Sequence, residues 1–192
     1  AFTPSTTPLT AITNTSLLTC QSNRFIDNST NNFTITRNGD VKVTNFAPFA
    51  PSSAYSTSTN GGSAYFDGSG DYLTAPSNAA FGMGTGDFTW EAWIYITAVS
   101  SYKQVFSSRS GPTTTTTSGS LAINPYGGLS WYTNGFIIDY TTSIGTNQWV
   151  HVAVCRSGTT LRVFANGVQV GSATNSDNLT NTQFTVGANA DG

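Results

Sequence analysis

The side chains able to do acid–base chemistry are few in this chain and stand apart from one another. The single glutamate, Glu91, lies in the run Phe88-Thr89-Trp90-Glu91-Ala92-Trp93-Ile94-Tyr95. Glycoside hydrolysis needs two carboxylates flanking one bond, and that run offers no second acid. The single histidine, His151, stands in the middle of an apolar run, which favours a paired histidine on a sheet face over a catalytic base. We therefore predict no catalytic residues and a protein that is not an enzyme.

Asp67 and Asp71 enclose Gly68-Ser69-Gly70 and form an oxygen-rich corner. Calcium takes six to eight oxygen ligands, and only two carboxylates are visible here. Gly and Asp also serve tight turns without any ion. We predict no metal ligands and no cofactor, and keep calcium-dependent binding as the alternative.

Alternating apolar and polar residues predict an all-β chain, because successive side chains of a strand point to opposite faces. Strands are expected at 63–66, 71–74, 87–97, 103–108, 119–124, 128–133, 136–140, 149–156, 160–165, 168–173 and 183–187. Asn134-Gly135, Asn166-Gly167 and Ser157-Gly158 are typical of hairpin turns. Phe88, Trp90, Ala92, Ile94 and Ile96 should share the core face of one strand. The strand 149–156 is apolar on both faces, so it should be central and covered on both sides.

The N-terminal third has a different composition. Ala1 to Thr10 is rich in Thr and Pro, which predicts an extended arm. We therefore divide the chain into an N-terminal arm, residues 1–14, and one domain, residues 15–192. A first strand is expected over Thr15 to Gln21. Residues 33–37 and 41–44 should pair as a hairpin around Asn38-Gly39. Residues 45–62 and 112–119 are expected to be loops.

Charge is scarce in this chain of 192 residues: charged residues make up 8%, against 38% hydrophobic and 12% aromatic. The net charge of −2 and the scattered basic residues exclude a nucleic-acid partner, and no apolar run approaches the length of a membrane helix. A surface of Ser, Thr, Asn and Gly is typical of extracellular or virion-surface proteins. Cys20 and Cys155 are read as two buried thiols, with a disulfide as the alternative.

Four segments carry a family resemblance: 65–73 (Tyr-Phe-Asp-Gly-Ser-Gly-Asp-Tyr-Leu), 88–95, 149–154 and 161–167. In this order they resemble the laminin-G-like jelly roll of the concanavalin A-like lectin and glucanase superfamily, of the type repeated in phage tail-fibre-like and bacterial surface proteins. The resemblance implies a two-sheet antiparallel sandwich. The Glu-x-Asp-x-x-Glu pattern of the superfamily's hydrolases is absent. Glycan binding, its common non-enzymatic role, would use an aromatic cluster beside an amide, which here is Tyr126, Trp131, Tyr132 and Asn134. The alternative is that one of Trp131 and Tyr132 faces the core and the other is only solvated.

The resemblance also implies a closing strand after Phe184-Thr185-Val186-Gly187, and the sequence ends before such a strand. Either the sequence is a fragment of a longer protein, or another chain supplies the strand. We therefore expect an open sheet edge and an arm (Phe2, Pro4, Pro8, Leu9) that reaches a neighbouring copy. The favoured function is a structural subunit of an extracellular or virion-surface fibre, with copies of itself in a filament or tandem array as partners. The alternative is a monomeric lectin-like module that binds cell-surface glycans. Sequons at Asn14, Asn28, Asn32 and Asn178 predict glycosylation.

Overall fold

The computed structural model describes residues 1–22, 24–49, 56, 60–109 and 117–188, and within them the chain is built from short antiparallel strands. One 3₁₀ turn, η1 (Ala79–Phe81), interrupts them. The strands are β1 (Thr36–Asn38), β2 (Lys42–Thr44), β3 (Ser63–Tyr65), β4 (Tyr72–Ala75), β5 (Phe88–Tyr95), β6 (Lys103–Ser107), β7 (Ser120–Ile123), β8 (Leu129–Tyr132), β9 (Phe136–Tyr140), β10 (Trp149–Ser157), β11 (Thr160–Ala165), β12 (Val168–Thr174) and β13 (Phe184–Val186). The predicted strands from residue 63 onward are all confirmed.

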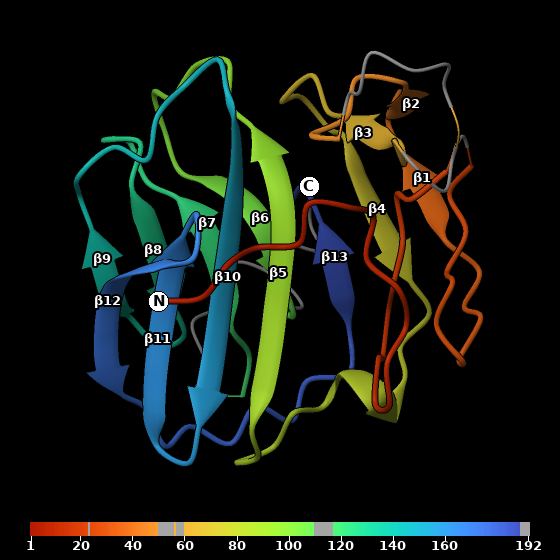
Figure 1. The fold of residues 1–192 in the computed structure, drawn as a ribbon. Helices are drawn as coiled ribbons and strands as arrows, with labels where there is room; N and C mark the ends of the chain where they lie inside the picture. Colours follow the sequence, from red (N-terminus) through yellow and green to blue (C-terminus); the bar gives the residue numbers. More distant parts are fainter. Residues whose placement is uncertain (23, 50–55, 57–59, 110–116, 189–192) are drawn as a thin grey trace.

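Two sheets face one another, as Figure 1 shows with the four-stranded sheet in front. The larger sheet has the order β1-β4-β13-β6-β7-β8-β9, the smaller has the order β12-β11-β10-β5, and β2-β3 form a separate pair. Chain neighbours β8/β9, β10/β11 and β11/β12 pair at the predicted hairpins. In the last of these turns Asn166 and Gly167 have φ of 48° and 76°, the left-handed geometry that Asn and Gly tolerate best.

The core lies between the two sheets and is supplied by the face predicted from alternation. Val150, Val152 and Val154 of β10 are 0% exposed, and Trp90 and Ile94 of β5 pack against the same cluster. Apolar burial of this kind is the main stabilising term of a sandwich.

The outer face of β10 is covered as well. His151 is 1% exposed and Ala153 is 2% exposed. Phe2 packs edge-on to His151 at 5.7 Å between ring centroids, and Phe46 lies 5.2 Å from Trp149. The covering side chains come from the N-terminal third, so β10 is central and covered on both sides, as expected.

A buried arginine ties the loops at one end of the sandwich together. Arg156 is 2% exposed, and its guanidinium donates to the carbonyl oxygens of Gly84 (2.7 Å), Gly86 (2.9 Å from Nη2) and Asp177 (2.8 Å). The ring of Phe88 lies 5.1 Å below it. Paired donors of this kind make burial of the charge tolerable.

Two predictions for the N-terminal third are wrong. Residues 15–21 form no strand, because Leu18 donates its N–H to the carboxylate of Asp27 (3.0 Å) and accepts from the N–H of Asn28 (2.7 Å) in place of a ladder. The turn at Asn38-Gly39 exists, with φ of 69° at Gly39, yet β1 pairs with β4 and β2 pairs with β3. The turn therefore sends its two strands into different sheets and makes no hairpin.

The arm residues contact their own chain. Phe2 donates its N–H to the carbonyl of Gly167 (2.8 Å), and its ring lies 5.2 Å from Phe164 on the four-stranded sheet. The carbonyl of Leu9 accepts from the side chain of Gln21. The expectation that this arm reaches outward is therefore not met at Phe2 and Leu9.

β5 is an edge strand of eight residues that pairs only with β10 among the described residues. It carries no Pro or Lys, the residues that usually protect an edge. The open edge expected after 184–187 stays a prediction, since β5 lies at the edge of the other sheet. The predicted loop at 112–119 lies mostly outside the described residues, as does much of 45–62.

Candidate functional site

The outer face of the seven-stranded sheet carries a continuous row of polar and aromatic residues. Direct cross-strand partners run from β1 to β9 in the order Thr36, Thr74, Thr185, Ser107, Ser120, Tyr132 and Phe136. Partners directly opposite in antiparallel strands share a face. The middle of the row is buried, with Thr185 and Ser120 at 1% and Ser107 at 0% exposed. Two accessible regions remain, one toward β8/β9 and one over β4/β13.

The first region is an exposed group of rings, which we call the aromatic patch: Tyr102, Tyr126, Tyr132 and Phe136. Phe136 stacks on Tyr102 with centroids 5.1 Å apart and meets Tyr132 edge-on at 5.0 Å. Tyr102, Phe136 and Tyr126 are 40%, 49% and 67% exposed. Partial burial raises the pKa of the Tyr102 hydroxyl, and the charges of Asp139 and Tyr126 raise it further.

The turn that bears Tyr126 is held by one amide. Asn124 is 0% exposed, and its Oδ1 accepts from the N–H groups of Tyr126 (3.1 Å) and Gly128 (2.9 Å). Its Nδ2 donates to Oδ1 of Asp139 (2.9 Å) and to the carbonyl of Tyr140 (3.0 Å). A buried, multiply bonded amide of this kind fixes the turn relative to β9, so the patch is preorganised.

The structure places the predicted glycan-binding residues unevenly. Tyr126 and Tyr132 belong to the patch, and the exposed Asn134 lies in the turn between Tyr132 and Phe136. Trp131 is a correction: it is 0% exposed and packs against Trp90 at 5.2 Å and Phe88 at 5.7 Å. Side chains alternate along β8, so Tyr132 faces outward because Trp131 faces the core.

Sequence reasoning missed Tyr102 and Phe136. Phe136 follows Asn134-Gly135 directly, so the hairpin register would have placed it opposite Tyr132. Tyr102 reaches the patch from the segment before β6 through a contact between distant residues, for which the sequence gives no local signal.

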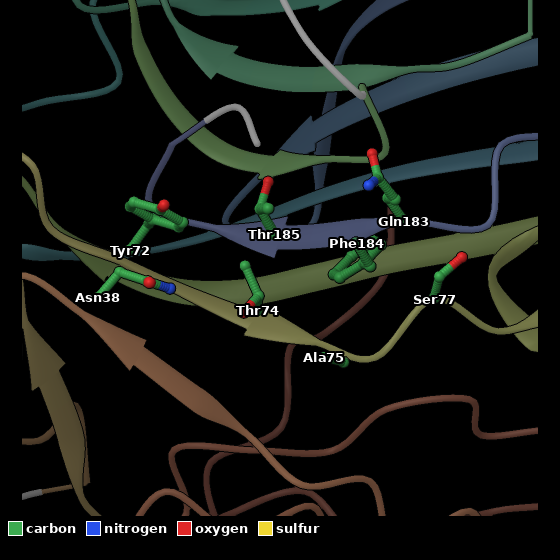
Figure 2. A pocket seen from close by; sticks show the side chains of 8 residues that line it. All are labelled: Asn38, Tyr72, Thr74, Ala75, Ser77, Gln183, Phe184 and Thr185. Atoms are coloured by element: carbon green, nitrogen blue, oxygen red, sulfur yellow. The ribbon is translucent and has the colours of Figure 1, made fainter. Parts of the chain in front are cut away.

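The second region is a shallow pocket of about 280 Å³ over β1, β4 and β13 (Figure 2). Tyr72 and Asn38 lie at one end, Gln183 and Ser77 at the other, and Thr74 and Thr185 between them. The side chains that line it are hydroxyls, amides and rings, and no lining residue is charged.

Asp67 and Asp71 are joined by Asp40, and ligand oxygens of all three lie within 4.8 Å of one another. Asp71 is already engaged by the backbone: Oδ2 accepts from the N–H of Asp67 (3.0 Å) and Oδ1 from that of Asp40 (2.7 Å). These bonds hold the pKa of the Asp71 carboxyl below its ordinary value despite partial desolvation. The cluster therefore organises the turns of 39–40 and 67–71.

The remaining reactive side chains are paired or buried. Nε2 of His151 lies 3.3 Å from Oε2 of Glu91 on the outer face of the four-stranded sheet, which confirms a paired sheet-face histidine. Cys20 and Cys155 are both free thiols, as the favoured interpretation expected, but both are half-buried and not fully buried. Burial raises the pKa of Cys20 to about 11 and also raises that of Cys155.

The four sequon asparagines, Asn14, Asn28, Asn32 and Asn178, are all exposed. Glycosylation at these positions stays a prediction. Among the described residues no helix has the length and apolarity needed to cross a bilayer.

Two facing antiparallel sheets with this strand order agree with a match between residues 67–192 and a sequence family described as the concanavalin A-like lectin/glucanases superfamily. The chain belongs to this superfamily. The match covers well over half of the chain, in its laminin-G-like type, and confirms the resemblance drawn from the sequence.

Solved structures with the same fold include the receptor-binding domain of botulinum neurotoxin C/D mosaic serotype, at 18% identity and a TM-score of 0.64, covering 91% of this chain and 43% of that one. The binding domain of botulinum neurotoxin serotype D matches equally, at 18% identity, a TM-score of 0.64, and 91% and 43% coverage. Domain 4 of an extracellular arabinanase from Geobacillus stearothermophilus, in complex with arabinotriose, has 19% identity, a TM-score of 0.57, and 82% and 74% coverage. The chain thus spans less than half the length of the neurotoxin binding domains. No curated protein matches it.

Proposed function

We propose that this domain is a non-enzymatic glycan-binding module and that the aromatic patch is its binding surface. The observation that carries the proposal is the exposure of three rings, Tyr102, Tyr126 and Phe136, on a sheet face held rigid by the Asn124 network. Rings lose little conformational entropy on binding. Sugar rings present apolar C–H faces to such platforms, while the amide of Asn134 is available for hydroxyl groups.

The relatives favour the same class of function. The neurotoxin domains are described as receptor-binding, and the arabinanase domain was solved with arabinotriose. We infer an extracellular setting, since the described surface is uncharged in large part and the arabinanase is extracellular. The Asp40, Asp67 and Asp71 cluster makes calcium dependence testable by comparing binding in calcium and in a chelator.

A second role, as a fibre subunit, is favoured by one observation: among the described residues, the eight-residue strand β5 pairs with β10 alone. Exposed strand edges are templates for pairing with another chain. Sedimentation and negative-stain microscopy of the purified domain test this role. A monomer at all concentrations, with no ordered fibres, would remove it.

The glycan role is tested by array screening followed by titration of the best ligand against Tyr126→Ala and Phe136→Ala. Loss of one stacking ring should weaken binding about tenfold, since an aromatic contact contributes about 1 to 1.5 kcal/mol. Tyr65→Ala is the matched control, because Tyr65 is 48% exposed on β3 and packs under Lys42. Equal affinity in all three variants would refute the patch as the binding surface.

A further inference from the structure

The pocket over β4 and β13 (Figure 2) is lined by polar side chains, several of which have no hydrogen-bond partner among the described residues. Within the described part of the chain, the side chains of Asn38, Tyr72, Thr74 and Gln183 make no hydrogen bond to another residue, so water satisfies them. Their groups include amide and hydroxyl donors as well as carbonyl and hydroxyl acceptors. A ligand that replaces this water must offer both donors and acceptors.

We propose that this pocket is a second binding site, separate from the aromatic patch, that takes a single unit of a neutral sugar. Only the ligand class rests on the proposed function. None of the eight lining residues is charged, so the pocket has no cation for a phosphate, sulfate or carboxylate and no carboxylate for a metal ion. Hydroxyl groups match the mixed donors and acceptors, and the ring of Tyr72 matches the apolar face of a sugar.

The rim of the pocket is held in place. The hydroxyls of Ser77 and Thr182 lie 2.6 Å apart, and the N–H of Asn78 donates to the carbonyl of Thr182 (2.9 Å). The hydroxyl of Thr185 donates to the carbonyl of Ser107 (3.2 Å). These bonds join the segment after β4 to β13 and β13 to β6, so binding requires little ordering of the protein.

The pocket and the patch are independent because the row between them is buried. Ser107 is 0% exposed and Ser120 is 1% exposed, and these two residues lie between Thr185 at the pocket and Tyr132 at the patch. One sugar unit cannot bridge four strands that lie about 4.8 Å apart. We therefore expect two separate binding events on one face.

The test is an amide NMR titration of the whole domain with cellotriose, xylotriose and arabinotriose, with sialyllactose as the charged comparison. Side-chain amide signals of Asn38 and Gln183 report the pocket, and the backbone amides of Tyr126 and Phe136 report the patch. Gln183→Ala and Thr74→Val should each weaken pocket binding about five- to tenfold, the cost of one hydrogen bond of about 1 to 1.4 kcal/mol. Gln169→Ala, an exposed glutamine of β12, is the matched control.

The outcomes separate the two proposals. Shifts at both reporters, with Gln183→Ala affecting the pocket alone, support both sites. Shifts confined to Asn38 and Gln183 support the pocket and refute the patch. Shifts confined to the patch, or equal affinity of Gln183→Ala and the unchanged domain at the pocket, overturn the pocket and leave the proposed function intact. No shift with any of the four ligands overturns both. Saturation of the pocket by sialyllactose alone overturns the assignment of the pocket to a neutral sugar and leaves the proposed function intact.

Discussion

Trp131 is the residue for which the sequence and the structure make opposite predictions about function. The sequence groups it with Tyr126 and Tyr132 as a glycan contact, whereas the structure buries its indole completely against Phe88 and Trp90. A Cβ added to Gly119 would lie 2.2 Å from the indole ring, so backbone also packs directly on it. Trp131→Ala should therefore reduce stability and should not act through ligand contact.

The expected cost follows from the size of the cavity. Removal of a fully buried tryptophan side chain costs about 3 to 5 kcal/mol. For a chain of this length each kcal/mol lowers Tm by about 2 to 4 °C, so we expect a fall of about 6 to 20 °C. Trp131→Phe should cost less than half as much. It keeps most of the apolar ring and removes an indole N–H that is buried without an acceptor, which itself costs about 1 to 3 kcal/mol.

The assay combines calorimetry with glycan titration at a temperature where Trp131→Phe is fully folded. We expect a graded loss of Tm from Phe to Ala at this position and unchanged glycan affinity for the folded Phe variant. Tyr126→Ala should show the reverse, with lost affinity and an almost unchanged Tm. A Tm for Trp131→Ala within the error of the unchanged domain would refute the core assignment, and so would a folded Trp131→Phe that no longer binds glycan.

Three further outcomes follow from buried polar groups. Arg156→Leu should lower the free energy of unfolding by about 3 to 5 kcal/mol in urea titration, since it leaves the carbonyl oxygens of Gly84, Gly86 and Asp177 without their donor. Arg156→Lys should cost less. Equal stability of the Leu variant and the unchanged domain would contradict the role of the guanidinium. Desolvation raises the pKa of Asp27, but hydrogen bonds from the N–H groups of Phe33, Leu18 and Ser29 outweigh it and hold this pKa below its ordinary value. Hydrogen bonds from the N–H groups of Asp67 and Asp40 lower the pKa of Asp71 in the same way. A carboxyl whose pKa is lower in the folded state than in the unfolded state stabilises the fold at pH values above its unfolded pKa, and this contribution is lost as the pH falls. The stability of the domain should therefore drop below about pH 4. Asp27→Asn should make that drop smaller in acid titrations followed by circular dichroism. Burial of part of each side chain raises the pKa of both thiols, so Cys20 and Cys155 should react more slowly with a disulfide reagent at mildly alkaline pH in the folded domain than after denaturant is added. Equal labelling rates in the two states would contradict the raised pKa values.

The strands from residue 63 onward are predictable from sequence because each is short, alternates cleanly and ends at a Gly-containing turn. The N-terminal third is not, because its backbone bonds go to side chains. Asp27 alone accepts from the N–H groups of Leu18, Ser29 and Phe33, and no periodicity announces such a network. Similarly, Asn38-Gly39 correctly indicates a turn but does not say which sheets its flanking strands join.

Only part of the candidate site could be predicted from the sequence, for a related reason. Alternation shows that Trp131 and Tyr132 face opposite ways, but the inward choice depends on which face of β8 meets the other sheet. Tyr102 enters the patch only because β6, β7, β8 and β9 bring it near Phe136. Such contacts between distant residues are a property of the sheet and not of any local segment.

The outer faces of the two sheets differ in how much of each is covered by the chain itself, and this difference favours one of them as the proposed binding surface. The outer face of the four-stranded sheet is covered by the chain's own Phe2, Phe46 and Phe49, which contact His151, Trp149 and Trp93. A ligand that reached the strands beneath these rings would have to displace aromatic contacts that contribute to stability. A hollow of about 280 Å³ remains on this face beside Phe2, Glu91 and Cys155. The outer face of the seven-stranded sheet instead leaves rings and uncommitted hydroxyl and amide groups in water. Because these aromatic contacts commit much of the first face to folding, we propose that recognition uses the second face, on which the patch and the pocket both lie.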